Sequence, residues 1–158
     1  MVNSRGLNFG RIRHYKGHAR LFREFAAACA DDCTAGGRPL HLWVIGENKD
    51  KIDLHGEATK AGVPAGSYTV TEVLLFDAAL GNVFAAADIA VFAHDPTALS
   101  VLNSGSVMAA LSFGVPVIAP RLGCIGALIC PSSIQCGNVE AFAAFYEPSN
   151  STAIGALS

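Results

Sequence analysis

Residues 102–106 read Leu102-Asn103-Ser104-Gly105-Ser106, a turn of small and polar side chains that leads into an apolar helical run at 107–113. A short apolar segment at 115–119 follows and has the composition of a buried strand. A helix that begins with so little side-chain bulk exposes its unpaired backbone N–H groups to an anion. The stretch therefore predicts a helix–strand unit of an α/β fold whose helix N-terminus can bind a negative group.

A second candidate for anion binding lies near the start of the chain, in Gly10-Arg11-Ile12-Arg13-His14-Tyr15-Lys16-Gly17. This basic loop is bounded by glycines and joins a predicted strand to a predicted helix. Arg11 and Lys16 can neutralise charge that backbone amides leave unbalanced, and each hydrogen bond to a charged group contributes about 1.5–3 kcal/mol. Together the two segments predict a site for a phosphorylated ligand, most simply a diphosphate.

Strand-like and helix-like runs alternate along the chain. Apolar strands separated by helices indicate a doubly wound, parallel, Rossmann-like sheet, and the length indicates one domain over residues 1–158. The expected strands are 7–12, 40–45, 67–71, 89–93, 115–119 and 143–146, and the expected helices are 18–30, 50–61, 77–87 and a run from Ser104.

Ligands of doubly wound sheets bind beyond the carboxyl ends of the strands. That rule brings four segments to one edge, namely 11–16, 46–48, 94–97 with the turn at Asn103, and 120–123. We expect Arg11 to end its strand there and Asn103 to be the N-cap of the following helix. The predicted ligand-binding residues are Gly10, Arg11, Lys16, Gly46, Asn103, Ser104, Gly105 and Ser106.

Composition excludes several classes of protein. The 158 residues are 51% hydrophobic and 15% charged, which excludes a disordered chain. A net charge of −2 argues against a dedicated nucleic-acid binder, and no apolar run reaches the ~20 residues that a membrane span needs. Residues 1–9 lack the regions of a signal peptide. We expect a cytoplasmic protein and leave peripheral attachment to a membrane open.

The five cysteines contain no CxxC pair. Cys29 and Cys33 lie one helical turn apart, so they are either a metal-binding pair or, as we favour, two small apolar residues in a reducing compartment. The five histidines show no metal-ligand spacing and are expected to be ordinary surface or strand residues. No acidic DxD-type motif is present. We therefore expect neither a metal nor another cofactor.

Five landmarks occur in one order along nearly the whole chain: Gly10-Arg11-Ile12 with Lys16-Gly17, Val44-Ile45-Gly46, Ala86-Ala87-Asp88-Ile89-Ala90-Val91, Gly114-Val115-Pro116-Val117-Ile118-Ala119, and Phe145-Tyr146-Glu147-Pro148-Ser149-Asn150. In these segments the chain resembles the C-terminal, nucleotide-sugar-binding half of the family 4 (group 1) retaining glycosyltransferases, which have the GT-B fold. The resemblance implies that Arg11 and Lys16 are catalytic, because they hold the donor diphosphate and stabilise it as a leaving group. It also implies that backbone N–H groups of the turn at 103–106 donate hydrogen bonds to the same diphosphate.

Two departures from the family pattern limit what is carried over. Registered on Gly114-Val115-Pro116, the two acids of the family's Glu-(seven residues)-Glu motif correspond to Val101 and Ala109, whose side chains accept no hydrogen bond. Contacts to the sugar and ribose are left with His94, Asp95 and Thr97 as weak candidates. The second departure is that the sequence contains the pattern of only one of the two domains of a GT-B enzyme. The acceptor-binding domain is expected before Met1, and the isolated chain is expected to be inactive.

The resemblance implies an enzyme that transfers a hexose from a nucleoside-diphosphate sugar to an acceptor with retention of configuration. The base, the sugar and the acceptor are not specified. The alternative is a non-catalytic doubly wound module that binds a nucleotide or a partner protein. A flavodoxin-like signalling domain is set aside, because its acidic phosphoacceptor would stand where Gly10-Arg11 is found.

Overall fold

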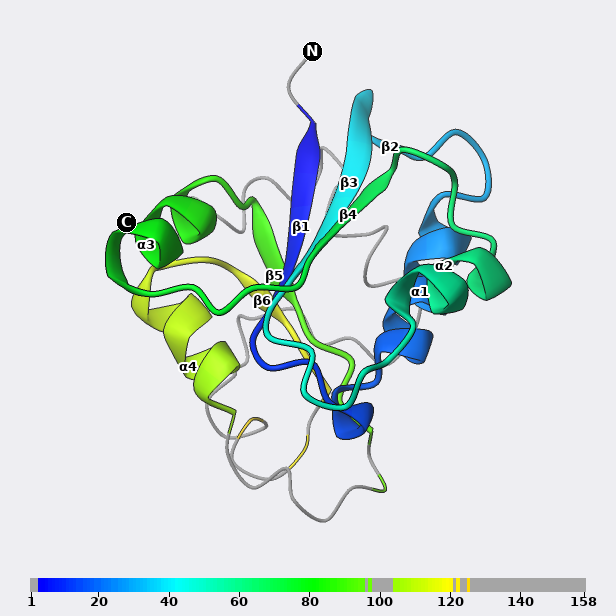
Figure 1. Ribbon diagram of the computed structural model, residues 1–158. Helices are drawn as coiled ribbons and strands as arrows, with labels where there is room; N and C mark the ends of the chain where they lie inside the picture. The colour runs from blue at the N-terminus through cyan, green and yellow to red at the C-terminus, as the bar shows by residue number, and fades with distance from the viewer. Residues whose placement is uncertain (1–2, 96, 98–103, 121, 123–124, 126–158) are drawn as a thin grey trace.

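The computed structural model of the chain describes residues 3–95, 97, 104–120, 122 and 125. The strand expected at 143–146 lies outside these residues. In chain order the elements are β1 (Ser4–Phe9), the 3-10 helix η1 (His14–Lys16), α1 (His18–Ala28), β2 (Thr34–Ala35), β3 (Arg38–Ile45), α2 (Leu54–Ala61), β4 (Tyr68–Thr71), α3 (Asp77–Ala85), β5 (Ile89–Val91), α4 (Gly105–Ser112) and β6 (Val117–Ile118) (Figure 1).

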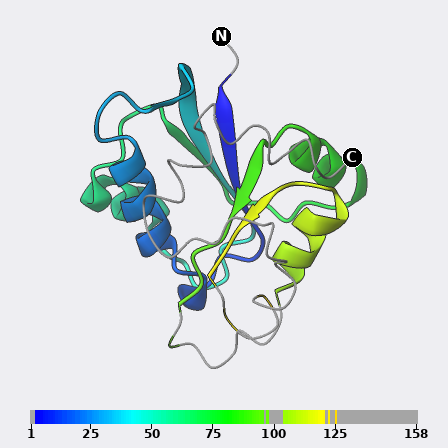
Figure 2. The ribbon, with the colours of Figure 1, turned by 180° about the vertical axis from the view of Figure 1, so that it is seen from behind.

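The parallel strands follow the order β4-β3-β1-β5-β6. The chain thus winds outward in both directions from β1, as in the strand order 3-2-1-4-5 of a doubly wound dinucleotide-binding sheet. Helices α1 and α2 cover one face of the sheet, and α3 and α4 cover the other, as both views show (Figures 1 and 2). The predicted doubly wound, Rossmann-like α/β fold is confirmed.

Each face of the sheet has its own apolar core. On the α1 side, Leu21, Phe22 and Phe25 are buried against Leu42 and Val44 of β3. On the other face of the sheet, Phe84 of α3 and Val107 of α4 pack against β1 and β5. Full burial of one such side chain contributes about 1.5–3 kcal/mol, so these two cores hold the strands in register.

Several boundaries differ from the predicted ones. β1 ends at Phe9 instead of residue 12, because Gly10 takes a φ of 120° that turns the chain out of the strand. Arg11 consequently lies in the loop and not at the end of a strand. The helix expected from residue 50 begins at Leu54, since the Asp53 side chain caps it by accepting the N–H of Gly56.

A hairpin joins β2 to the start of β3. β2 pairs antiparallel with the start of β3, and Gly36 and Gly37 between them have φ angles of 56° and 74°. Positive φ at both central residues is the requirement of a tight hairpin turn. The sheet therefore carries one short antiparallel edge strand that the apolar pattern of the sequence does not predict.

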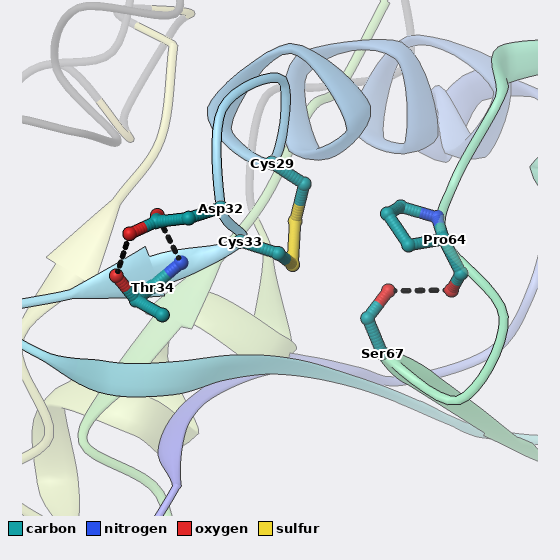
Figure 3. Close-up of a disulfide and its surroundings, with 6 residues drawn as sticks. All are labelled: Cys29, Asp32, Cys33, Thr34, Pro64 and Ser67. Carbon is teal, nitrogen blue, oxygen red and sulfur yellow. Dashed lines mark hydrogen bonds between the residues drawn. A yellow bond between two sulfur atoms is a disulfide. The ribbon is translucent and has the colours of Figure 1, made fainter.

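Cys29 and Cys33 form a disulfide at the end of α1, so the expectation of two unlinked thiols is wrong (Figure 3). Cys29 is the C-cap of α1, and Cys33 has a left-handed φ of 52° that turns the chain back toward the helix. Asp32 supports this reversal, because its carboxylate accepts hydrogen bonds from the backbone N–H and the hydroxyl of Thr34 at 3.0 and 2.8 Å. The chain reversal brings together two cysteines that sequence spacing had placed on a continuing helix.

Candidate diphosphate-binding site

Three chain segments meet at the carboxyl edge of the sheet, where η1 and the start of α4 lie at the lower end of Figure 1. Gly10 follows β1, and a Cβ atom there would overlap the hydroxyl of Ser106 at the start of α4. Gly46 follows β3, and a Cβ atom there would overlap the backbone carbonyl oxygen of Gly10. Glycine is thus needed at both positions for the strand ends and the helix to approach one another.

Lys16 is the buried cation of this edge. The residue is 8% exposed, and its Nζ atom donates a hydrogen bond to Ser106 Oγ at 3.3 Å. Gly17 has a φ of 69° and packs so closely on the Ala93 carbonyl that no side chain fits, which holds Lys16 under the β5 end. Burial lowers the pKa of Lys16 from 10.5 to about 8, so the ammonium is charged at neutral pH but poorly solvated. A buried, poorly solvated ammonium is stabilised more by an anionic ligand than an ammonium in water is, because the ligand replaces the lost solvation.

The N-terminus of α4 lies beside this ammonium. Ser104 is the N-cap, with extended backbone angles and a hydroxyl that accepts the N–H of Val107 at 3.4 Å. The cap is one residue later than predicted, because the Ser104 hydroxyl satisfies the donor that was assigned to the side chain of Asn103; Asn103 itself lies outside the described residues. Gly105 is exposed, and a Cβ atom added there would meet nothing within 4 Å, so an anion can approach the first-turn amides.

Arg11 does not join Lys16. Its side chain is 61% exposed, and Nε lies 3.9 Å from Oε2 of Glu47, which also pairs with Lys49. An exposed ion pair of this kind contributes about 0–1 kcal/mol. The structure therefore brings together Gly10, Lys16, Gly46 and Ser106 from the predicted set and leaves the guanidinium of Arg11 at the rim.

Two buried imidazoles replace Arg11 as neighbours of Lys16. His18 is 3% exposed and His94 is 1% exposed, which corrects the expectation of ordinary surface or strand histidines. The pKa of each falls from 6.5 to about 4, first because of burial and then because of the charge on Lys16. The position of His18 directly after Lys16-Gly17, at the start of a helix, is the sequence signal that could have indicated its burial.

The remaining candidates for sugar and ribose contacts have local roles. The Asp95 carboxylate accepts hydrogen bonds from the N–H and the hydroxyl of Thr97 at 2.8 and 2.7 Å. Ala109 is half-buried and packs against the apolar core on the α4 side. Where the family has its second acid, this chain therefore has a small apolar side chain that contributes to the core. Val101 lies outside the described residues.

The sequence predicts neither a metal site nor a membrane-spanning helix. Among the residues that the structure describes, no group of three or more His, Cys, Asp or Glu is placed to hold a metal ion. The described helices include none that is long and apolar enough to traverse a bilayer.

A doubly wound sheet with a buried lysine and a helix N-terminus at its carboxyl edge defines a Rossmann-like domain with a candidate anion site. A family model described as "Glycosyl transferases group 1" matches residues 4–146. The chain therefore belongs to the group 1 glycosyltransferases. No curated protein matches it.

Solved structures show the same fold at low identity. HepE from Anabaena, in complex with UDP-glucose, has a TM-score of 0.69 and 19% identity over 96% of this chain and 41% of its own. A UDP-forming trehalose-phosphate synthase from Burkholderia xenovorans, in complex with glucose-6-phosphate, has a TM-score of 0.71 and 12% identity over 98% of this chain and 38% of its own. WaaG, a glycosyltransferase involved in lipopolysaccharide biosynthesis, has a TM-score of 0.63 and 20% identity over 85% of this chain and 33% of its own. The chain thus spans less than half the length of each of these proteins.

Proposed function

We propose that this chain is the donor-binding domain of a retaining glycosyltransferase that uses a nucleoside-diphosphate hexose. The observation that carries the proposal is the buried ammonium of Lys16, 3.3 Å from Ser106 Oγ at the N-terminus of α4. Membership of the group 1 family supports it, as do the UDP and UDP-glucose named for the HepE complexes. We assign the chain to the C-terminal half of a family 4 GT-B enzyme, with the acceptor domain as its partner.

The proposed chemistry is stabilisation of the leaving group. As the bond between the sugar C1 and the phosphate oxygen breaks, negative charge builds on the departing diphosphate. The ammonium of Lys16, the Ser106 hydroxyl and the first amides of α4 are fixed in place before the reaction, so they stabilise that charge without reorganising. Arg11 adds a second charge by leaving its weak ion pair with Glu47.

Calorimetric titration with UDP and GDP tests this assignment on the wild type, Lys16→Ala and Arg11→Ala. We expect each substitution to cost about 1.5–3 kcal/mol, which is a roughly 10- to 150-fold weaker Kd. The matched control is Lys60→Ala, because Lys60 pairs with Glu57 on the exposed surface of α2 and lies in a different part of the fold. Equal Kd values for the wild type and both site variants would contradict the diphosphate assignment.

A non-catalytic nucleotide-binding module is the second candidate. The packing of Ala109 where the family has an acid favours it, since a module that only binds has no need of that contact. Both candidates bind UDP, so the discriminating observation is the gene: a second Rossmann-like domain encoded in frame upstream favours the enzyme, and an unrelated upstream sequence favours the module.

A further inference from the structure

His94 is a buried histidine whose ring nitrogens have no hydrogen-bond partner in the part of the chain that the structure describes. It follows β5 at the carboxyl edge of the sheet, is 1% exposed, and neither Nδ1 nor Nε2 has a partner among the described residues. Ring stacking holds it instead, with the Tyr15 ring centroid at 6.3 Å and the Phe92 centroid at 5.9 Å. A buried polar group without a partner costs about 1–3 kcal/mol, so an imidazole kept in this state is suited to a partner that arrives later.

The surroundings of His94 explain why it is neutral in the free protein. Burial of the ring is the main reason that the pKa of His94 is lowered, and the positive charge of Lys16 in η1 and then His18 of α1 lower it further. His18 differs from His94, because its ring makes a hydrogen bond to the backbone of Arg13 and only Nδ1 lacks a partner. The backbone N–H of Asp95 donates to the Tyr15 carbonyl at 2.9 Å, which ties the β5 end to the loop that carries Lys16.

The charged groups on the other side of His94 are already balanced. Asp95 is held by two hydrogen bonds from Thr97, and these, together with the charge of Arg20, lower the pKa of the Asp95 carboxyl. The described residues of α4 beside Lys16, which are Ser104, Gly105 and Ser106, bring no titratable side chain. After burial, the positive charge of Lys16 is therefore the next cause that keeps both imidazoles neutral, and it is the one that a bound anion would offset.

We propose that His94 is a further cationic group of the diphosphate site: it is neutral while the site is empty and takes up one proton from solvent when a diphosphate binds to Lys16. This inference rests on the proposed function. The anion reverses the local charge and offers phosphate oxygens as acceptors, so a protonated His94 gains a partner for a ring N–H. No covalent bond forms or breaks, and the proton is supplied by the buffer. His94 thereby adds a buried charge to those proposed for Lys16 and Arg11.

Proton-linked calorimetry with UDP-glucose tests this proposal. The diphosphate of a nucleotide sugar carries no proton that titrates near pH 6, so protons taken up there come from the protein. Titrations of the whole chain at about pH 6 in buffers of different ionisation enthalpy give the number of protons bound per ligand. We expect about one proton for the wild type, and a Kd that tightens by up to about tenfold per pH unit between about pH 7 and 5.

Two His94 variants and one matched control identify the group. His94→Phe keeps the stacked ring and removes both nitrogens, and His94→Gln keeps hydrogen bonding without a titrating group. Both are expected to lose the proton uptake and the pH dependence of the Kd, because neither side chain titrates. His18→Phe is expected to keep the uptake. Thermal unfolding checks that each variant is folded.

The outcomes separate this inference from the proposed function. UDP-glucose binding by the wild type without proton uptake would overturn the role of His94 and leave the diphosphate site standing. Uptake that persists in both His94 variants and disappears in His18→Phe would also overturn it. Absence of binding to the wild type, with UDP and GDP equally inactive, would overturn the proposed function itself.

Discussion

Replacing Lys16 by methionine should stabilise the protein while weakening diphosphate binding. Methionine has a similar length and no charge, so it fills the same buried space without the cost of desolvating an ammonium. The fall in the pKa of Lys16 from 10.5 to about 8 corresponds to about 3 kcal/mol at roughly 1.4 kcal/mol per unit. Loss of the hydrogen bond to Ser106 lowers the expected stabilisation by about 1 kcal/mol. We expect a net gain of about 2 kcal/mol in the free energy of unfolding at pH 7.

The pH dependence of this gain has a definite sign. Between about pH 8 and 10.5 the unfolded chain binds more protons at residue 16 than the folded chain does, so the wild type becomes more stable as the pH rises through this window. Lys16→Met has no such group. The difference between the two proteins is therefore full below about pH 8 and fades by about pH 10.5.

Urea unfolding followed by circular dichroism at several pH values between about 7 and 10.5 measures this difference. Lys60→Met is the matched control, because the Lys60 side chain is 74% exposed and its replacement should leave stability nearly unchanged. A destabilised Lys16→Met, or a gain that does not change with pH, would refute the argument that burial of the Lys16 charge opposes folding. Either result would also weaken the case that the site is prepared for an anion.

Three further perturbations test the same edge of the sheet. Ser104→Ala removes the N-cap of α4 and should lower the free energy of unfolding by about 0.5–2 kcal/mol in urea titrations, whereas an unchanged midpoint would contradict the assigned cap. Gly46→Ala places a Cβ on the Gly10 carbonyl oxygen, so both the melting temperature and UDP affinity should fall; an unchanged affinity in calorimetry would show that the strand ends need no close approach. Protonation of His18 and His94 should destabilise the free protein as the pH falls from about 6.5 to 4, because only the unfolded chain binds those protons in this window; stability measured by urea unfolding that is flat there in the wild type, or equally steep in His94→Phe, would count against it.

The candidate site was partly predictable because the small residues that its backbone requires can be recognised from a few neighbouring residues in the sequence. Gly10, Gly46 and Ser106 are small residues next to strand ends or a helix start, and the rule that parallel strands end at one edge places them together. Lys16 could be assigned to the same edge for the same reason. The direction of a long side chain is not a local property, however. Arg11 and Lys16 look equivalent in the sequence, yet one pairs with Glu47 in solvent and the other is buried against Ser106.

The order of strands and helices, and hence the doubly wound fold, was determined by the sequence alone, because apolar periodicity and glycine positions act over a few residues. Tertiary structure decided which charges were buried. The pKa values of Lys16, His18 and His94 depend on the packing of η1 and the start of α1 against the end of β5, which lies far along the chain from both. The Cys29–Cys33 disulfide depends on a left-handed residue, Cys33, that reverses the chain after α1 has ended at Ala28, and the apolar pattern of the sequence does not predict this conformation. Desolvation of the three titratable side chains arises from contacts between the start of the chain and the end of β5, which no short window of sequence contains.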